Sequence, residues 1–316
     1  AHHIIIDGYA ALAIMRRTVD RYSALRRGEE PRDKPPATMA DIVAYEEAYQ
    51  GSTRRQTDRT HWLDRVADLP ERVTLSKVGT TGSLSFDNVV ASAALNPDRQ
   101  RRYEALAGEL NSSLAVLMTS AFGAFLARMS NHDDIVLSLP VTGRATAKIK
   151  ISGGMVSNIL PIRLREVASK SVRELIQTAQ LELTGALRHQ RYRSDDIRRD
   201  AGLDQSSVSF GPTINMVFFD EQVAIDGTEM EYRILTSGIL EDLLINLYQS
   251  SPGAPLVVDL HGNPHLYALA ELDALHQRFL TFLDRFLSEE ALDTPVADVG
   301  LLVDTDRRLL EALPQP

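Results

Sequence analysis

Apolar positions along the chain recur in two spacings, one typical of strands and one typical of helices. Short alternating or continuous apolar runs, bounded by proline or polar turns, predict strands, and apolar residues that return every three or four positions predict amphipathic helices. This mixture indicates an α/β fold, in the form of an α+β sandwich of sheet and helices. Strands are expected at about 83–95, 135–139, 156–164, 213–219, 243–248 and 256–260. Helices are expected at about 39–69, 96–110, 113–129, 171–188 and 272–287. The helix at 113–129 is hydrophobic nearly all round, which predicts burial.

The first residues predict the end of a buried strand followed by a helix. Residues 1–6 are mostly apolar, and Asp7 is placed to cap the helix that follows. Gly28 stands after a basic last turn, as is usual at a helix end, and the helical spacing before it is carried by Leu12, Met15, Val19 and Tyr22. A strand at residue 1 has no partner before it, so we expect the chain to be the later part of a longer protein. Residues 28–40 are polar and rich in proline, and are the best candidate for a lobe boundary.

Composition and charge narrow the function classes. The chain has 316 residues, enough for two compact lobes, and a formal net charge of −9. A nucleic-acid binder would need a surplus of lysine and arginine, so that class is disfavoured. The absence of cysteine excludes disulfides, thiolate zinc sites and a cysteine nucleophile, and it fits a cytoplasmic location. No apolar run approaches the roughly 20 residues that cross a bilayer, and no signal peptide is visible.

Two adjacent histidines followed by an aspartate form the most unusual chemical motif of the sequence, His2-His3-Ile4-Ile5-Ile6-Asp7-Gly8. Three interpretations are open. A metal site is disfavoured, because adjacent histidines in an extended segment point to opposite faces and no other cluster of ligand-type residues has suitable spacing. A buried histidine satisfied by hydrogen bonds is the default. A catalytic imidazole, which titrates near neutral pH and accepts or positions a proton, is the third.

Further motifs follow in a fixed order along the chain. Residues 133–144 end in Pro-Val-Thr-Gly-Arg, residues 154–163 read Gly-Met-Val-Ser-Asn-Ile-Leu-Pro-Ile-Arg, and His189-Gln190 comes next. Val299-Gly300-Leu301-Leu302 then precedes a charged helix. Together with the His-His motif, these segments resemble the condensation domains of nonribosomal peptide synthetases, members of the chloramphenicol acetyltransferase-like superfamily. The resemblance covers essentially the whole chain, and it implies that the N-terminal part of such a domain is missing.

The resemblance implies a V-shaped pair of acyltransferase-like lobes with a tunnel between them. Residues 1–38 would be the remainder of the N-terminal lobe, residues 39–290 the C-terminal lobe with its crossover and floor segments, and residues 291–316 a linker toward an adenylation domain. Donor and acceptor carrier proteins would insert phosphopantetheine arms from the two ends, and the acceptor amine would attack the donor thioester to form an amide. The implied partners are therefore these peptidyl carrier proteins and the adenylation domain. No intrinsic cofactor, metal, nucleic acid or membrane is implied.

The resemblance also assigns roles within the His-His motif. His3 matches the family's second, functional histidine, which either takes the amine proton or orients the amine. Asp7 matches a carboxylate that pairs with the arginine of the Pro-Val-x-Gly-Arg motif, here Arg144, and such a buried pair would fix the loop that carries His3. Gly8 is expected to allow close backbone approach at the helix start, where N–H groups face a developing oxyanion. His2 is expected to point away from the tunnel.

Two more residues are expected at the tunnel. Tyr9 stands where many family members have tryptophan, and Asn158 either lies near the tunnel floor or caps the end of a strand. Trp62 is expected to pack in the core. The remaining histidines are expected to be structural, and they are His61, His132, His261, His265 and His276.

Two segments depart from the family pattern and leave the subtype open. The usual Pro-Phe-Glu after His189-Gln190 is replaced by Arg193-Ser194-Asp195-Asp196, and residues 207–212 stand where an Arg-Asp-x-Ser-Arg-Asn-Pro-Leu segment is expected. The donor stereochemistry is therefore undecided. An epimerisation domain, an ester-forming acyltransferase and a non-catalytic recruitment platform are the alternatives. The Pro-Val-Thr-Gly-Arg segment favours condensation over epimerisation, and the intact His3 argues against a platform.

Overall fold

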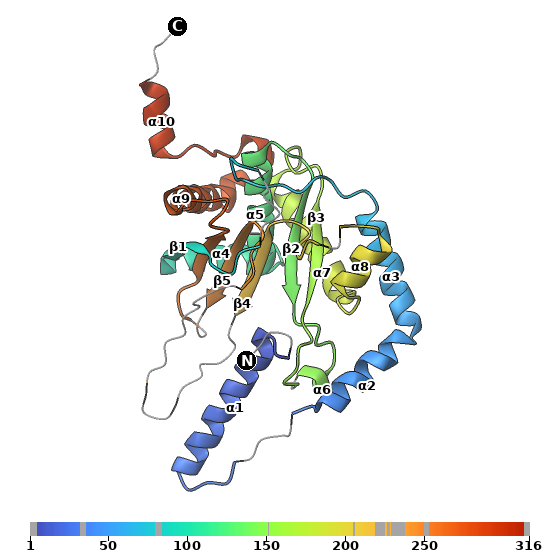
Figure 1. Ribbon diagram of the computed structural model, residues 1–316. Coiled ribbons are helices and arrows are strands. Elements are labelled where there is room, and N and C mark those ends of the chain that lie inside the picture. Colours follow the sequence, from blue (N-terminus) through green and yellow to red (C-terminus); the bar gives the residue numbers. More distant parts are fainter. Residues whose placement is uncertain are drawn as a thin grey trace.

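The computed structural model describes residues 5–31, 36–79, 84–150, 152–204, 206–218, 225, 228, 238–249 and 253–312. The centre of the fold is a six-stranded mixed sheet in the order β1-β6-β5-β4-β2-β3 (Figure 1). Its strands share one core with the surrounding helices, which confirms the expected mixed α/β class. The strands are β1 (Val89–Ala94), β2 (Ile135–Val141), β3 (Asn158–Leu164), β4 (Thr213–Phe218), β5 (Leu243–Gln249) and β6 (Val257–Gly262).

The directions of the strands decide which strand ends and loops lie together on one side of the sheet. β2, β4 and β5 run parallel, so their carboxyl ends lie together, and we call this the C-terminal edge, where Val141, Phe218 and Gln249 end the three strands. β3 is antiparallel to β2 and therefore begins at the same edge, with Asn158 opposite Val141. The segments before β3 and after β2 are thus brought together there.

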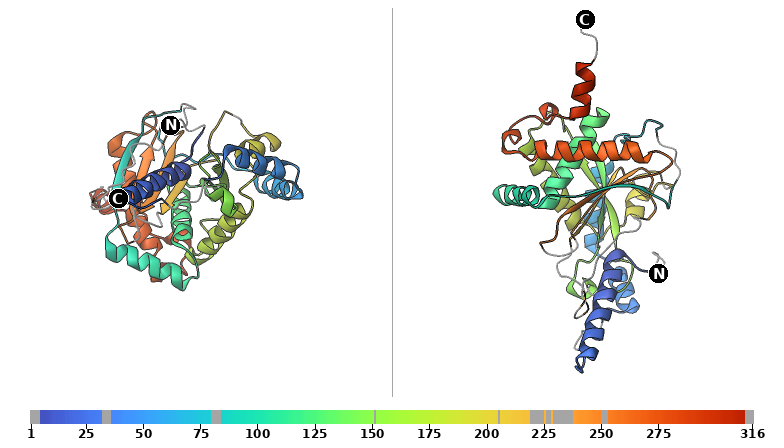
Figure 2. Two further views of the ribbon diagram at one scale, coloured as in Figure 1. Left: turned by 90° about the horizontal axis from the view of Figure 1, so that it is seen from below. Right: turned by 90° about the vertical axis from the view of Figure 1, so that its left-hand side faces the viewer.

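One layer of helices covers one face of the sheet (Figures 1 and 2). α5 packs against β2 and β4, α7 against β3, α9 against β1 and β6, and α4 against α5. The α5 residues from 116 to 127 are all buried, which confirms the burial expected from its all-round hydrophobicity. The layer consists of α4 (Pro97–Glu109), α5 (Leu114–Ser130), α7 (Val172–Arg188) and α9 (Leu269–Phe286).

The remaining helices surround this body. α1 (Gly8–Arg26) starts at the C-terminal edge and projects away from the sheet (Figures 1 and 2), and the Asp7 side chain accepts the N–H of Ala10 as its N-cap, as expected. In the described part of the chain, no single helix could cross a bilayer by length and hydropathy; α4 and α5 could do so only as a pair, and they are bent by 102°. The other helices are α2 (Met39–Gln50), α3 (Thr53–Val66), α6 (Ala147–Lys150), α8 (Ser194–Asp200) and α10 (Asp304–Glu311), with 3₁₀ turns η1 (Glu289–Ala291) and η2 (Val296–Asp298).

Several element boundaries differ from the expected ones. The helical stretch at 39–69 is two helices, because Gly51 ends α2 and the Ser52 side chain starts α3 by accepting the N–H of Arg55 at 3.2 Å. The apolar spacing continues across this break and therefore does not reveal it. The strand expected to end at Pro140 continues to Val141, since the fixed φ of proline is compatible with an extended chain. α6 and α8 were not expected.

The two strands predicted nearest the N-terminus, at residues 1–6 and 83–95, also need correction. Within 83–95, regular pairing covers only β1, and Ser85 forms an isolated bridge to Leu240. Of residues 1–6, the structure describes Ile5 and Ile6, and neither lies in a strand. Ile5 is in a turn and exposed, so the expected buried strand end is not found at these two positions.

Candidate functional site

Asp7 and Arg144 form a buried ion pair at the C-terminal edge, between the start of α1 and the loop after β2. Arg144 Nη1 lies 2.8 Å from Asp7 Oδ2, and Nη2 lies 2.9 Å from Oδ1. The two side chains are 1% and 2% exposed. The expected bidentate contact is therefore confirmed. Each charge fixes the other, because separating them would leave a buried charge without compensation.

The Asp7 carboxylate also collects three backbone N–H groups from two distant segments. Oδ1 accepts from Ala10 at 2.8 Å, and Oδ2 accepts from Val156 at 2.9 Å and Ser157 at 3.0 Å. Burial would raise the pKa of Asp7, but the hydrogen bonds from Arg144, Val156 and Ala10 outweigh it and hold the pKa below its ordinary value. Asp7 is therefore charged at neutral pH, and it ties α1 to the segment before β3.

The Arg144 guanidinium is held from further sides. It donates to the carbonyl oxygens of Thr142 at 3.0 Å and Gly154 at 2.8 Å. Its central carbon lies 4.7 Å from the centroid of the Tyr9 ring, which is a cation–π distance. Tyr9 therefore covers the ion pair with one side of its ring while the residue stays 41% exposed. Its expected place along a substrate tunnel stays a prediction.

Gly143, not Gly8, is the glycine that the backbone geometry of this site requires. Gly143 has φ +65°, and a Cβ there would lie 2.3 Å from the carbonyl oxygen of Val156. At Gly8 a Cβ would meet no described atom within 4 Å, and its φ is not positive. The close backbone approach expected at Gly8 is therefore absent from the described part of the chain. Gly143 belongs to the Pro-Val-Thr-Gly-Arg motif that stood out in the sequence. The sequence did not show that a glycine is needed there because the Val156 carbonyl oxygen lies so close.

Asn158 uses its whole side-chain amide on the loop after α7. Nδ2 donates to the carbonyl oxygens of Gln190 at 3.0 Å and Tyr192 at 2.8 Å, and Oδ1 accepts the N–H of Ser194 at 2.9 Å. The side chain is buried. These bonds fit the strand-end capping alternative, and a position near the tunnel floor stays a prediction.

His2 and His3 lie outside the described residues, so their positions stay predictions.

Trp62 is 2% exposed and packs in the core, as expected. His276 is buried and hydrogen-bonded to the carbonyl oxygen of Val258, and His132 is hydrogen-bonded to the carbonyl oxygen of Ser130, two residues before it, so both fit the structural role expected of them.

A second cluster of titratable groups, not identified from the sequence, lies between α3 and the end of α7. His189 Nδ1 is 2.7 Å from Asp58 Oδ1, and the hydroxyl of Tyr49 donates to Asp58 Oδ2 at 2.7 Å. The His61 ring stacks on the His189 ring with centroids 3.9 Å apart. The His189-Gln190 pair stood out in the sequence, but its carboxylate partner is 131 positions away. This cluster anchors the start of the loop that Asn158 holds.

The segment that departs from the family pattern at 207–212 is organised by Glu241. Its carboxylate accepts the Ser207 hydroxyl at 3.0 Å and the N–H groups of Val208 and Ser209 at 2.8 and 3.1 Å. Arg72 donates to the same carboxylate at 3.0 Å. Hydrogen bonds to the Glu241 carboxylate, just before β5, therefore fix the start of the 207–212 segment.

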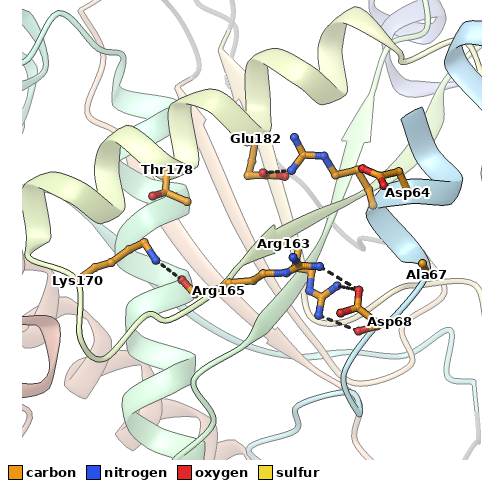
Figure 3. A pocket seen from close by; sticks show the side chains of 9 residues that line it. Asp64, Ala67, Asp68, Arg163, Arg165, Lys170, Thr178 and Glu182 are labelled. Atoms are coloured by element: carbon orange, nitrogen blue, oxygen red, sulfur yellow. Dashed lines mark hydrogen bonds and ion pairs between the residues drawn. The ribbon is translucent and has the colours of Figure 1, made fainter. Parts of the chain in front are cut away.

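A cavity of about 440 Å³ opens between α3, β3 and α7 (Figure 3). It lies near the end of β3, opposite Val136, and so at the far edge of the sheet from Asp7. Its cations are already compensated, since Arg163 pairs with Asp68 and Asp134, Arg65 with Glu182, and Lys170 with Glu166. Among the described residues, no group of three or more histidine, aspartate or glutamate side chains could hold a metal ion.

Comparisons with known proteins show which family the chain resembles over nearly its whole length. The chain matches the family model described as Condensation domain over residues 1–311. It is 32% identical over 307 residues to a dimodular nonribosomal peptide synthase of Bacillus subtilis (strain 168), covering 97% of this chain and 13% of that protein. It is 34% identical over 323 residues to an isonitrile lipopeptide synthase of Streptomyces coeruleorubidus, covering 98% and 22%.

Solved structures give the same result at the level of the fold. The first condensation domain of the calcium-dependent antibiotic synthetase, in complex with a substrate analogue, superimposes with a TM-score of 0.86 at 33% identity, covering 96% of this chain and 66% of that one. A variant of the starter condensation domain of rhizomide synthetase gives a TM-score of 0.86 at 30% identity, covering 95% and 68%. The chain thus spans 13% and 22% of those two curated relatives, and about two thirds of these structures.

Proposed function

Because this chain belongs to the condensation-domain family of nonribosomal peptide synthetases, we propose that it forms an amide bond between two carrier-bound substrates. The donor is an acyl or peptidyl thioester, and the acceptor is an aminoacyl thioester. The observation that carries the proposal is the buried Asp7–Arg144 pair, which joins the end of the His-His motif to the Pro-Val-Thr-Gly-Arg motif. Two motifs that are 137 positions apart in the sequence meet at one edge of the sheet.

His3 is the proposed reactive residue. The acceptor's α-ammonium group must lose a proton before its nitrogen can attack, and a neutral imidazole facing it would accept that proton or orient the amine. Once this first proton has passed to the imidazole or to water, the neutral amine nitrogen bonds to the thioester carbonyl carbon. The carbon–sulfur bond breaks, and the second proton that the nitrogen loses ends on the departing thiolate. Asp7, four positions after His3, supports this step by holding the start of α1 in place.

The remaining assignments belong to the same proposal. The substrates arrive on phosphopantetheine arms of donor and acceptor peptidyl carrier proteins, and an adenylation domain is the adjacent partner. Residues 1–38 contribute to an N-terminal lobe, residues 39–290 form the C-terminal lobe, and residues 291–316 lead toward the adenylation domain. A tunnel between the two lobes, reached by Tyr9 and Asn158, connects the carriers. The cysteine-free composition supports a cytoplasmic location.

The proposal is tested by product formation in the native protein supplied with loaded donor and acceptor carriers. His3→Ala should form at least about a hundred times less condensed product, in line with the usual contribution of a positioned acid or base. His132→Ala, which changes an exposed histidine in a loop, should act like the parent protein. Undiminished product from folded His3→Ala, measured by intact-protein mass spectrometry, would contradict the role of His3.

An epimerisation domain shares the His-His motif and is separated by a second assay. The parent protein is incubated with a carrier-bound aminoacyl substrate in deuterated water. Deuterium at the α-carbon without amide formation would replace the proposed reaction by epimerisation. A parent protein that forms no product and exchanges no deuterium would favour a recruitment platform.

A further inference from the structure

Arg193 is the first residue of the segment Arg193-Ser194-Asp195-Asp196, which stands in place of the family's Pro-Phe-Glu. It is the N-cap residue of α8, and its φ of −67° is one that proline adopts. The backbone conformation at this position therefore suits a proline, while the arginine adds a long, charged side chain. Whether the arginine has a function at this position depends on the contacts that its side chain makes.

The Arg193 side chain reaches back to the segment that holds Asp7. Its Nη1 donates to two consecutive carbonyl oxygens, those of Val156 and Ser157, each at 3.1 Å. The N–H groups of the same two residues donate to Asp7 Oδ2. The peptide group between Val156 and Ser157 is therefore held at its carbonyl end by a cation and at its N–H end by an anion.

The charge of Arg193 is available for this purpose. In the part of the chain that the structure describes, Arg193 forms no ion pair with a carboxylate, whereas its neighbours Arg191 and Arg199 are paired with Glu46 and Asp196. A cation at the carbonyl oxygen polarises a peptide group and strengthens the hydrogen bond donated by its N–H. Asp7 is thus held by Arg144 directly and by Arg193 through one peptide group.

We propose that Arg193 is a positioning residue for amide formation: it orders the Val156–Ser157 backbone so that its N–H groups hold Asp7, and through Asp7 the segment that carries His3. This inference rests on the proposed function and deepens it.

The test compares three variants in the native protein. Arg193→Met keeps most of the apolar stem and removes both hydrogen bonds and the charge, and Arg193→Lys keeps a charged donor. Arg199→Met, on the exposed face of α8, is the matched control. We expect Arg193→Met to lower kcat by about tenfold and to change KM by less than about twofold. This is the pattern expected when a variant loses stabilisation of the transition state and keeps its binding of the substrate. Arg193→Lys should recover most of the activity, and Arg199→Met should match the parent.

A second readout separates positioning from general destabilisation. Amide hydrogen exchange of Val156 and Ser157 should speed up at least about tenfold in Arg193→Met, while the melting temperature falls no further than about 3 °C below that of Arg199→Met. Unchanged exchange at these two amides, or a kcat for Arg193→Met equal to that of an active parent, would overturn the inference. Failure of the proposed function is distinguished by the parent itself forming no amide.

Discussion

His189 Nδ1 lies 2.7 Å from Oδ1 of Asp58, a carboxylate that is 1% exposed on α3. The same oxygen is 2.8 Å from Arg54 Nε, and the other oxygen accepts the Tyr49 hydroxyl. The indole N–H of Trp62 donates to the His189 carbonyl oxygen at 2.9 Å. The end of α7 is thus fixed to α3 by a side chain and by the backbone, and the loop that contacts Asn158 begins from this fixed point.

Removal of the Asp58 carboxylate should be more damaging than removal of the His189 ring. Asp58→Ala leaves a hydroxyl and an imidazole without their buried acceptor, and we expect it to lower the free energy of unfolding by about 2–3 kcal/mol. His189→Gln leaves Asp58 with Arg54 and Tyr49 and should cost about 1 kcal/mol. Asp64→Asn, at an exposed position of the same helix, should be neutral within about 0.5 kcal/mol. Equal losses for Asp58→Ala and Asp64→Asn in denaturant unfolding would contradict this anchor.

His61 should make the stability depend on pH. Burial, assisted by the neighbouring His189, lowers the pKa of His61 to about 4 from its ordinary value of 6.5. Between these two values the unfolded chain binds a proton that the folded protein does not bind, so stability falls as the pH decreases from 6.5 toward 4.

The corresponding experiment compares unfolding at pH 7.5 and pH 5. Because His61 is only half-buried, we expect it to contribute about 1–2 kcal/mol to the difference between the two pH values. His61→Gln cannot bind the proton, so its stability should fall less than that of the parent. An identical pH dependence in the two proteins would show that His61 does not carry this effect.

The Asp7–Arg144 pair should show strong coupling in a double-mutant cycle. Asp7→Asn or Arg144→Met leaves one buried charge without its partner, and each should cost about 3–5 kcal/mol of unfolding free energy. The double variant leaves neither charge, so its cost should be well below the sum of the single costs. Unfolding by denaturant measures all three variants. Strict additivity would argue against the contact.

Gly143 and Gly8 form a matched test of backbone geometry. Gly143→Ala puts a methyl group against the Val156 carbonyl oxygen at a positive φ, and it should cost about 2–4 kcal/mol. Gly8→Ala places a methyl group where no described atom lies within 4 Å, at the start of a helix, and should change stability by less than about 1 kcal/mol. Thermal unfolding compares them. A larger loss from Gly8→Ala would reverse the assignment.

Local features of the fold could be predicted because their causes lie close together in the sequence. Asp7 and Ser113 cap helices through the N–H groups three residues later, and the all-round hydrophobicity of 113–129 is enough to predict its burial. The break between α2 and α3 was not predicted, because Gly51 interrupts a pattern of apolar residues that continues on both sides.

In the candidate site, too, some contacts could be expected from the sequence and others became visible only in the structure. The Asp7–Arg144 contact could be expected only because the order of motifs resembled a known family, since nothing local to either residue selects the other. The roles of Gly143 and Arg193 became visible only when Val156 and Ser157 were seen beside Asp7. Asp58 and His189 likewise carry no sign of each other in the sequence.

By itself, the sequence determined the alternation of strands and helices, the capped helix starts and the family to which the motifs belong. These follow from side-chain spacing and from hydrogen bonds between near neighbours. The tertiary structure decided the order of the strands, and therefore which loops meet at the C-terminal edge. The partners of Asp7, Asn158 and Arg193 depend on that edge. They come from segments far apart in the chain, and burial of the shared core is the force that brings those segments together.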